Sequence, residues 1–434
     1  MNKVAESKQS FKAAFSSLIG TTIEWYDFNL YGLAAALVFP ALFFPGSDPF
    51  IGTLQAFGTF TLGFVARPLG GIVFGHFGDK VGRKSMLVIS LLLMGVATFL
   101  IGLLPTYESI GVWAPLLLII CRLLQGIGVG GEWGGATLIS VEHAPKGKKG
   151  FYGSWPQIGG PLGLLLATIV LSAVSILPEE QFMIWGWRLP FLVSIVLIAV
   201  GLFIRLQLNE SPDFQQVKEE KKVSRAPILD VFRLNKKQIL QVMGARFGEN
   251  GSYFIFSVFV LSYTTEQLGL PRSVVLNGVM LGTAIEVFTI PLFAFLSDRI
   301  GRRPIYLGGA IFIALFAFPF FWLLDTQNTA LIWFAIVSGL AIGHAAMYGP
   351  QAAFFSEMFG ANVRYSGISV GYQLASILAG GLAPLISTTL LSWSNGNSWS
   401  VALYVLVMAL ITVISVFFTK ETHKNQSTTN ITLS

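Results

Sequence analysis

Runs of about twenty apolar residues recur along the whole chain and constrain its fold more than any other feature. A helix needs about 20 mostly apolar residues to cross the hydrocarbon core of a bilayer. Only 12% of the 434 residues are charged, against about 25% in ordinary soluble domains. We therefore predict an all-α polytopic membrane protein with twelve transmembrane helices. The predicted spans are residues 18–44, 54–74, 86–105, 112–140, 151–177, 187–207, 240–265, 274–296, 305–324, 329–353, 366–391 and 399–419.

Composition and motif content argue against several other classes of function. The net charge of +6 would suit nucleic-acid binding only if the basic residues clustered on one solvated face, and here they fall between apolar runs. The chain has one cysteine, Cys121, and its histidines lack the spacing of metal ligands. No phosphate-binding loop motif occurs, and the glycine run from Gly126 to Gly135 lies within a span, where it allows close helix packing. We expect no cofactor, no metal, no nucleic acid and no ATP.

The distribution of basic residues predicts the orientation of the helices. Loops on the cytoplasmic side of a membrane carry an excess of lysine and arginine. With both termini cytoplasmic, all but five of the 28 basic residues lie on that side. Of these five, Arg67, Arg122 and Arg246 lie within spans, and Arg188 and Arg272 face outward. We therefore expect both termini in the cytoplasm.

An internal repeat divides the spans into two sets of six. The loop after the second span reads GHFGDKVGRK, and the loop after the eighth reads AFLSDRIGRR, 219 residues later. The predicted units are a first half (1–208), a cytoplasmic linker (209–238), a second half (239–420) and a cytoplasmic tail (421–434). Parallel repeats of this kind place a solute site at their interface near the bilayer midplane, where rocking of the halves exposes it alternately. This arrangement predicts a transporter and not a channel or an enzyme.

Several motifs resemble those of a known family of transporters. The repeated loop is similar to the signature loop of the major facilitator superfamily. Four further segments resemble motifs of the metabolite:proton symporter family within that superfamily. They are IEWYDFNLYG from Ile23, RPLGGIVFGHFGDKVGRK from Arg67, RLLQGIGVGGEWGGA from Arg122 and WGWRLPF from Trp185. ARFGEN and FGANVRYSGISVGYQLASILAGG are most similar to its shikimate-transporting branch. The resemblance implies import of an organic acid or zwitterion across a bacterial inner membrane, and we expect a monomer.

Eight charged residues lie deep within the predicted spans, away from the first and last turns. A charge at the centre of a membrane helix costs about 2.5–3.5 kcal/mol on insertion scales, so such residues are kept for pairing or for function. If every base pairs, two carboxyls remain, and a buried carboxyl without a partner readily binds a proton. The surplus of acids therefore predicts proton coupling. The eight are Glu24, Asp27, Glu132, Glu249, Glu286, Arg67, Arg122 and Arg246.

The first and fourth spans carry the residues that we expect to couple protons to transport. Glu24 and Asp27 are three residues apart and share a helix face. The resemblance to proton-linked sugar porters implies that Asp27 alternates between pairing with Arg122 and carrying a proton, with Glu24 as an additional proton-binding candidate. A static ion pair between Asp27 and Arg122 is the structural alternative.

A second set of residues forms the expected substrate cavity. Three intramembrane arginines favour an anion, and the neutral polar residues suit hydroxyl groups, so we predict a small hydroxylated carboxylate such as shikimate. Arg246 and Glu249 form either an internal pair or the two sides of a substrate contact. Arg67 and Glu132 either act on the solute or lock helices together, and the roles of Glu286 and His344 stay open. The cavity residues are Arg246, Glu249, Tyr31, Gln125, Glu132, Asn250, Tyr253 and Gln373.

The repeated loops are expected to form a cytoplasmic gate. By family resemblance, Asp79, Arg83, Asp298 and Arg302 hold the cytoplasmic side closed, with each aspartate accepting from a helix N-terminus or an arginine. The alternative is that these residues only serve topology and tight turns. Drug:proton antiport is a second possible function, because the sequence around Gly160 partly matches the antiporter signature. A receptor or enzyme would need a soluble domain, and the longest extramembrane stretch is the linker.

Overall fold

The structure of the protein, a computed structural model, describes residues 3–46, 49–207, 210, 215, 227–361 and 363–423, with the side chains of 3–8, 49–50, 79 and 227–230 not described. The described residues are helical with short connections and no strand. Each of the twelve predicted spans falls on helical segments, and the membrane-spanning helical fold is confirmed. Most of the predicted linker 209–238 lies outside the described residues.

The first half consists of the following elements: α1 (Lys3–Leu37), α2 (Phe39–Phe43), α3 (Pro49–Lys80), α4 (Arg83–Leu103), α5 (Tyr107–Ile110), α6 (Trp113–Glu142), α7 (Lys149–Val174), α8 (Glu179–Gln181), η1 (Phe182–Gly186), α9 (Arg188–Leu192) and α10 (Ser194–Leu206). The second half consists of α12 (Pro227–Leu234), α13 (Lys236–Phe254), η2 (Ile255–Phe259), α14 (Val260–Ser262), η3 (Tyr263–Gln267), α15 (Arg272–Ile300), α16 (Arg302–Asp325), α17 (Thr329–Ser338), η4 (Gly339–His344), α18 (Ala345–Ser356), α19 (Arg364–Ala375), η5 (Ser376–Gly381), α20 (Ala383–Trp393) and α21 (Trp399–Phe417).

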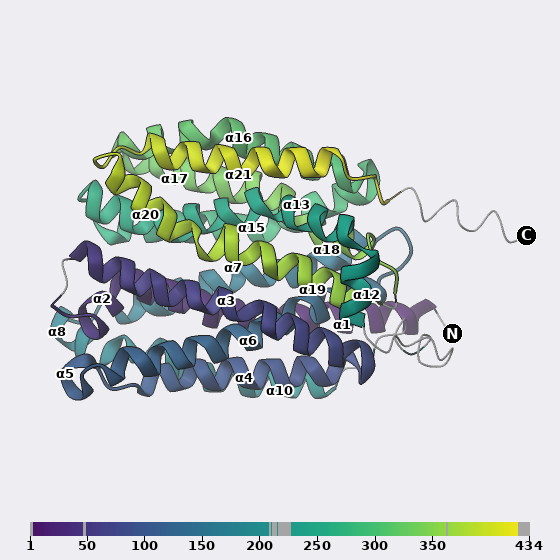
Figure 1. The fold of residues 1–434 in the computed structure, drawn as a ribbon, viewed down its shortest axis with the longest axis horizontal. Helices are drawn as coiled ribbons and strands as arrows, with labels where there is room; N and C mark the ends of the chain where they lie inside the picture. The colour runs from purple at the N-terminus through teal and green to yellow at the C-terminus, as the bar shows by residue number, and fades with distance from the viewer. Residues whose placement is uncertain are drawn as a thin grey trace, which may run out of the picture.

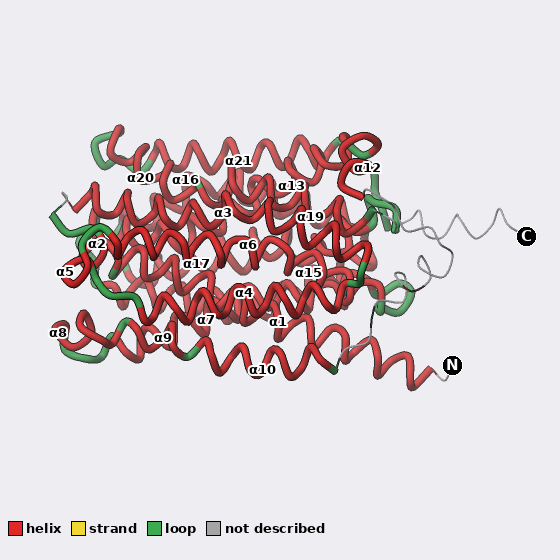
Figure 2. Tube along the Cα trace, turned by 60° about the horizontal axis from the view of Figure 1, so that its bottom comes forward, coloured by secondary structure: helices red, strands yellow, loops and turns green. Residues whose placement is uncertain are grey.

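The long helices run side by side along the long axis of the molecule (Figure 1). The purple and blue helices of the first half form one layer, and the green and yellow helices of the second half form the other. The start of α1 and the end of α21 lie at the same end of the bundle in both views (Figure 2). We call this the terminal end, and the other the opposite end. The sequence prediction places the terminal end in the cytoplasm.

In the part of the chain that the structure describes, ten helical segments are long and apolar enough to cross a membrane. The two long segments that do not meet this measure are α1 and the segment from α13 to η3, the first helices of the two halves. Both carry ionisable side chains at their centres, Glu24 and Asp27 in α1 and Arg246 and Glu249 in α13. Membrane helices keep such residues facing the bundle interior, so these two helices are the first place to search for a site.

Small residues bring the helices of the first half close together. A Cβ atom added at Gly126 or Gly130 of α6 would lie 2.1 Å from the Gly63 carbonyl oxygen or 2.0 Å from the Arg67 carbonyl oxygen of α3. Glycines four residues apart therefore let the two backbones touch, as the sequence predicted. In the second half, π-helical turns interrupt three membrane segments at η2, η4 and η5. Such turns often occur at functional sites, and η4 ends at His344 while η5 begins at Ser376.

Candidate functional site

A small cavity lies between the two halves near the centre of the bundle. Its volume is about 10 Å³, which is room for about one water molecule. The first half contributes Trp25, Gly160 and Pro161 to its wall, and the second half contributes Glu249, Tyr253, His344 and Tyr348. In this structure the space between these residues is therefore too small for anything larger than water.

On the second-half side, the cavity is backed by a buried polar network centred on Arg246. Its Nη1 donates to Glu249 Oε2 over 2.7 Å and to Gln351 Oε1 over 3.2 Å. Its Nε donates to Ser376 Oγ over 3.1 Å, and its Nη2 to Asn250 Oδ1 over 3.3 Å. The guanidinium also lies 3.2 Å from the ring centre of Tyr372. Arg246 is thus held on all sides by its own half.

His344 extends this network to a second carboxylate. Its Nε2 lies 3.0 Å from Glu249 Oε1, and its Nδ1 forms a short hydrogen bond with Glu286 Oε1. The imidazole is sandwiched between the rings of Tyr253 and Tyr348, each with its centre 4.8 Å away. Oε2 of Glu286 has no hydrogen-bond partner. Arg246, Glu249, His344 and Glu286, which we call the C-half network, form one continuous chain of contacts.

On the first-half side, Asp27 is buried without a basic partner. Its Oδ1 accepts a hydrogen bond from Ser194 Oγ over 2.9 Å, and its Oδ2 has no partner. Arg122 donates instead to Gln125 Oε1 and, over 3.4 Å, to the Phe60 carbonyl. Gln125 also contacts the main chain of α1, because its Nε2 donates to the Asp27 backbone carbonyl over 3.2 Å. Among the described residues, Asp27 and Arg122 form no direct ion pair, and Gln125 contacts the Arg122 side chain and the Asp27 backbone.

Glu24 and Arg67 lie at the interface with the second half. Both are at most 2% exposed, and Glu24 Oε2 and Arg67 Nε have no hydrogen-bond partner. The Arg67 guanidinium carbon lies 3.9 Å from the ring centre of Phe28 and 4.3 Å from that of Phe64. Glu24, Asp27, Arg67 and Arg122, which we call the N-half set, form no ion pair with one another among the described residues.

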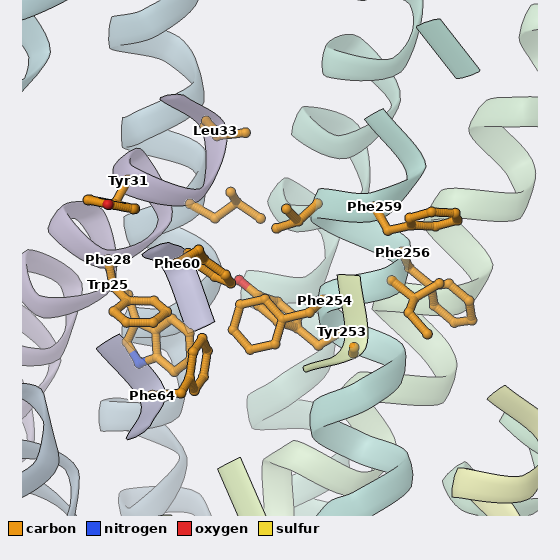
Figure 3. Packing of buried hydrophobic residues seen from close by; sticks show 14 of the residues in the cluster. Trp25, Phe28, Tyr31, Leu33, Phe60, Phe64, Tyr253, Phe254, Phe256 and Phe259 are labelled. Atoms are coloured by element: carbon orange, nitrogen blue, oxygen red, sulfur yellow. The ribbon is translucent and has the colours of Figure 1, made fainter. Parts of the chain in front are cut away.

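An aromatic cluster surrounds the N-half set and crosses the interface. Phe28, Phe60 and Phe64 of the first half pack against Phe254 of the second, with ring centres 5.2–6.4 Å apart (Figure 3). Trp25 meets Tyr253 edge to face at 5.8 Å. These rings exclude water from the charges, which strengthens electrostatic interactions among them.

Glu132, which the sequence left as either a substrate-contacting or a helix-locking residue, lies in a buried ion pair within the first half. It forms a bidentate ion pair with Arg205, with Nη1 to Oε2 at 2.8 Å, and accepts from Ser90 Oγ over 2.9 Å. It does not line the cavity described above. Arg205, which the sequence analysis assigned to the cytoplasmic side, is 2% exposed within the last turn of α10. This fourth arginine reduces the predicted surplus of intramembrane acids from two to one.

The other predicted cavity residues fall into two groups. Glu249 and Tyr253 line the cavity, and Arg246 and Asn250 lie directly behind them. Tyr31 and Gln125 belong to the surroundings of Arg122 within the first half; the Tyr31 hydroxyl donates to Thr59. Gln373 bridges the halves, since its Nε2 donates to the Gly130 carbonyl over 3.0 Å. His344, Glu286, Gln351 and Ser376 were not among the predicted site residues, because only the fold brings them together.

Contacts between the halves close the terminal end. Asp298 at the end of α15 accepts from the backbone N–H groups of Gly150 and Phe151 at the start of α7, over 2.9 and 2.8 Å. Arg302 donates to the same carboxylate over 2.7 Å. Arg364 of α19 pairs with Glu142 of α6 over 3.0 Å. An aspartate that accepts from a helix N-terminus of the other half is the geometry expected of a closed gate.

The repeated loop is matched by repeated partners in each half. Arg83 pairs with Glu142, and Arg302 with Glu357. Glu421 accepts from the backbone N–H groups of Arg302 and Arg303, each over 3.0 Å. These N–H donors lower the pKa of Glu421 against the raising effect of its burial. The side chain of Asp79, the fourth predicted gate residue, lies outside what the structure describes.

Further hydrogen bonds join the halves between the gate and the cavity. Tyr365 donates to the Gly131 carbonyl over 2.5 Å, and Gln157 donates to the Tyr348 carbonyl over 3.1 Å. Trp133 and Tyr372 stack across the interface with ring centres 3.7 Å apart. Toward the opposite end, Thr61 donates to the Gly381 carbonyl over 2.8 Å. The path from the cavity to the terminal end is therefore closed in this state.

Buried charges on membrane-spanning helices around a central cavity are typical of membrane transporters. The Major Facilitator Superfamily matches residues 14–378. The protein belongs to this superfamily, and its family and fold are those of membrane transporters and not of enzymes.

Relatives of the chain are themselves named as transporters. It is 45% identical over 416 residues to the shikimate transporter of Escherichia coli (strain K12), covering 95% of both chains. It is 43% identical to the inner membrane metabolite transport protein YhjE of the same organism, covering 95% of this chain and 94% of that protein. It is 36% identical to the proline/betaine transporter of that organism, covering 95% of this chain and 83% of that protein.

A solved structure confirms the fold. The proton:xylose symporter XylE bound to 6-bromo-6-deoxy-D-glucose superposes with a TM-score of 0.76 at 17% sequence identity, covering 97% of this chain and 99% of that one. At this identity the likeness shows the fold alone. With the family match, it establishes a multi-pass membrane transporter of small solutes.

Proposed function

We propose that the protein is a proton-coupled symporter that imports a small organic acid such as shikimate by alternating access. The 45% identity with a shikimate transporter supports the class of solute. The observation that carries the coupling is Asp27, a fully buried carboxyl that, among the residues the structure describes, has one oxygen without a hydrogen-bond partner and no ion pair. Burial disfavours the charged form of such a group, so it takes up and releases a proton as its surroundings change.

The coupling depends on how Asp27 and Arg122 communicate. Gln125 accepts from the Arg122 guanidinium and donates to the backbone carbonyl of Asp27, so it joins Arg122 to the main chain of α1 at Asp27. When Asp27 loses its proton, its negative charge attracts Arg122, and the arginine leaves the Phe60 carbonyl on α3. Protonation reverses the attraction. Asp27 lies on α1, Phe60 on α3 and Arg122 on α6. Binding or release of the proton therefore shifts these three helices relative to one another and changes the packing of the first half against the second.

The solute lies between the halves in this proposal. Glu249, Tyr253, His344 and Tyr348 offer polar groups for hydroxyls, and Trp25 offers an apolar face for a ring. The cavity holds about one water molecule, so the halves separate at one end to admit the solute. Opening at the opposite end precedes binding, and opening of the contacts at Asp298 and Arg364 releases the solute into the cytoplasm. Both termini face the cytoplasm of a bacterial cell in this scheme, and the transporting unit is the monomer.

The test is uptake of labelled shikimate by the purified protein in liposomes. With an inward proton gradient we expect accumulation above the outside concentration, and with an uncoupler we expect the internal and external concentrations to become equal. Accumulation that persists without a proton gradient would contradict symport.

A betaine is the second candidate solute. The chain is 36% identical to a proline/betaine transporter, and the rings of Trp25, Tyr253 and Tyr348 around the cavity suit a quaternary ammonium group. Unlabelled shikimate and glycine betaine added as competitors in the same assay distinguish the two. The solute that competes at the lower concentration is the better substrate.

A further inference from the structure

Arg67 is a buried arginine whose guanidinium N–H groups have no acceptor in the part of the chain that the structure describes. Its side chain is 1% exposed and lies on α3, and within the described part of the chain it forms no hydrogen bond or ion pair. A guanidinium carries five N–H donors, and a buried donor without an acceptor destabilises the protein by about 1–3 kcal/mol, more when it is charged. The guanidinium lies over the ring faces of Phe28 and Phe64 and, at 5.9 Å, that of Trp25.

Every other buried arginine that the structure describes has an acceptor. Arg205 pairs with Glu132, Arg246 with Glu249, and Arg83 with Glu142. Arg302 pairs with Asp298, and Arg122 donates to Gln125. Arg67 therefore differs from them in having cation–π contacts in place of an anion. Such contacts stabilise the charge but leave the planar N–H edge free.

The position of Arg67 points to the solute. Trp25, whose ring lies near its guanidinium, is a wall of the central cavity. The groups within electrostatic range of Arg67 come from both halves and include Glu24 and Arg122 of the first half and Arg246, Tyr348 and Tyr372 of the second. Of these, Arg246 is neutralised by Glu249, and Glu24 forms no hydrogen bond with Arg67 in this state. A positive charge without a bound anion thus lies at the edge of the cavity, between the halves.

We propose that Arg67 binds the carboxylate of the transported acid, with its two terminal N–H groups donating to the two carboxylate oxygens. This inference rests on the proposed function and assigns the residue that selects a carboxylate. A bidentate arginine–carboxylate pair is stronger and more directional than a pair with lysine. The rings of Phe28 and Phe64 hold the guanidinium in place before the solute arrives.

Glu24 makes this site responsive to protons. An ionised Glu24 and a solute carboxylate compete for the same guanidinium, and two carboxylates in one site repel each other. Binding of the acid to Arg67 therefore favours the protonated form of Glu24. One proton and one carboxylate therefore bind together beside the central part of α1, one helical turn from Asp27.

The experiment compares an acid with its uncharged ester. Labelled shikimate binds to detergent-purified protein in a scintillation proximity assay, and shikimate methyl ester is measured as a competitor. We expect wild-type protein to bind the acid at least tenfold more tightly than the ester. Arg67→Gln should weaken acid binding about 10–100-fold and leave the ester unchanged, so that the ratio approaches one. Arg67→Lys should recover part of the ratio.

Arg188→Gln is the matched control. Arg188 also lies over a ring, that of Trp187 at 4.5 Å, but it donates to the Gly102 and Leu104 carbonyls away from the cavity. We expect its acid-to-ester ratio to equal that of wild type. If Arg67→Gln fails to assemble, Arg67→Lys decides, because an unchanged acid affinity in that variant overturns the proposal.

The outcomes separate this inference from the proposed function. An unchanged ratio in Arg67→Gln, or an equal loss of acid and ester, overturns the role of Arg67 even if shikimate is transported. Wild-type protein that binds another acid from a panel, and not shikimate, corrects the solute, and the same acid-to-ester comparison then tests Arg67. Wild-type protein that binds no carboxylate overturns both.

Discussion

The two halves of the molecule hold their central charges in opposite ways. In the C-half network, Arg246, Glu249, His344 and Glu286 contact one another in an unbroken chain. In the N-half set, Glu24 and Asp27 lie without a basic partner, and Arg67 and Arg122 rest on aromatic rings. This difference in pairing indicates which buried charges stabilise the fold and which are available to bind a proton or a ligand. Paired charges hold helices in place, whereas unpaired buried charges persist only where binding a proton or a ligand neutralises them.

The largest expected effect comes from breaking the C-half network. Glu249→Ala leaves Arg246 buried without its anion, and loss of one partner of a buried ion pair costs about 3–5 kcal/mol. We expect a large fall in the thermal unfolding temperature of the detergent-purified protein. Glu24→Ala is the control from the N-half set, and we expect little or no fall because no pair is broken. Equal losses in the two variants would contradict the comparison.

A variant of the N-half set should affect transport and spare stability. Asp27→Asn keeps the acceptor for Ser194 and removes the charge, so we expect unfolding within about 1 kcal/mol of wild type. We expect proton-driven accumulation of the solute to disappear while exchange of labelled for unlabelled solute continues. Asp325→Asn is the control, since Asp325 accepts from Tyr263 and Ser398 in the second half, away from α1. Full proton dependence in Asp27→Asn would refute the coupling role.

The contrast between the halves was only partly visible in the sequence. Apolar runs and the repeated loop predicted the helices and the two halves, because hydropathy and charge are local properties. They also predicted Asp27 and Arg246 as intramembrane charges. Arg205 was missed as the partner of Glu132 because it lies in the last turn of its helix, although the predicted span 187–207 included it.

Contacts between distant helices had no signal in the sequence. Glu286 and His344 are 58 residues apart, and no local pattern indicates that they touch. The same holds for Gln125, whose neighbours Arg122 and Asp27 were expected to meet directly. Pairing within a helix follows from spacing, as for Arg246 and Glu249, which are three residues apart. Pairing between helices requires their rotation and tilt, which a single sequence does not specify.

The gate provides a test of contacts that join the halves. Asp298→Ala removes the acceptor for the Gly150 and Phe151 N–H groups, and hydrogen bonds to charged groups contribute about 1.5–3 kcal/mol. We expect the terminal end to open more often. Spin labels at Lys80→Cys and Arg299→Cys, with Cys121→Ser, measure the separation of the halves. An unchanged distance distribution would show that Asp298 does not hold the gate.

A smaller effect should follow from crowding an arginine of the N-half set. A Cβ atom at Gly63 would lie 2.3 Å from Arg122 Nε, whereas one at Gly58 on the same helix would meet nothing within 4 Å. Gly63→Ala therefore displaces Arg122 from the Phe60 carbonyl, a bond worth about 1 kcal/mol. We expect uptake to fall several-fold in Gly63→Ala and to stay unchanged in Gly58→Ala. Equal uptake in both would show that the position of Arg122 is not limiting.

The smallest effect concerns the terminal end, where the two halves are alike. Glu210 accepts from the backbone N–H groups of Arg83 and Lys84, as Glu421 does from those of Arg302 and Arg303. Burial by itself raises the pKa of Glu421. The hydrogen bonds from the backbone N–H groups of His423, Arg302 and Arg303 outweigh this effect, so the pKa of Glu421 lies below its ordinary value of 4.5.

A lowered folded-state pKa means that the stabilisation is present above pH 4.5 and is lost as the pH falls through the folded-state value. Because Glu421 is partly exposed and screened, its contribution is a few tenths of the roughly 1 kcal/mol of a helix cap. We expect Glu421→Gln to lower the unfolding temperature slightly at pH 7 and not at pH 3. Since Glu421 caps a helix of its own half, the label distances across the gate should not change. A gate that opened in Glu421→Gln would mean that the halves are coupled through their helix caps and not only through Asp298.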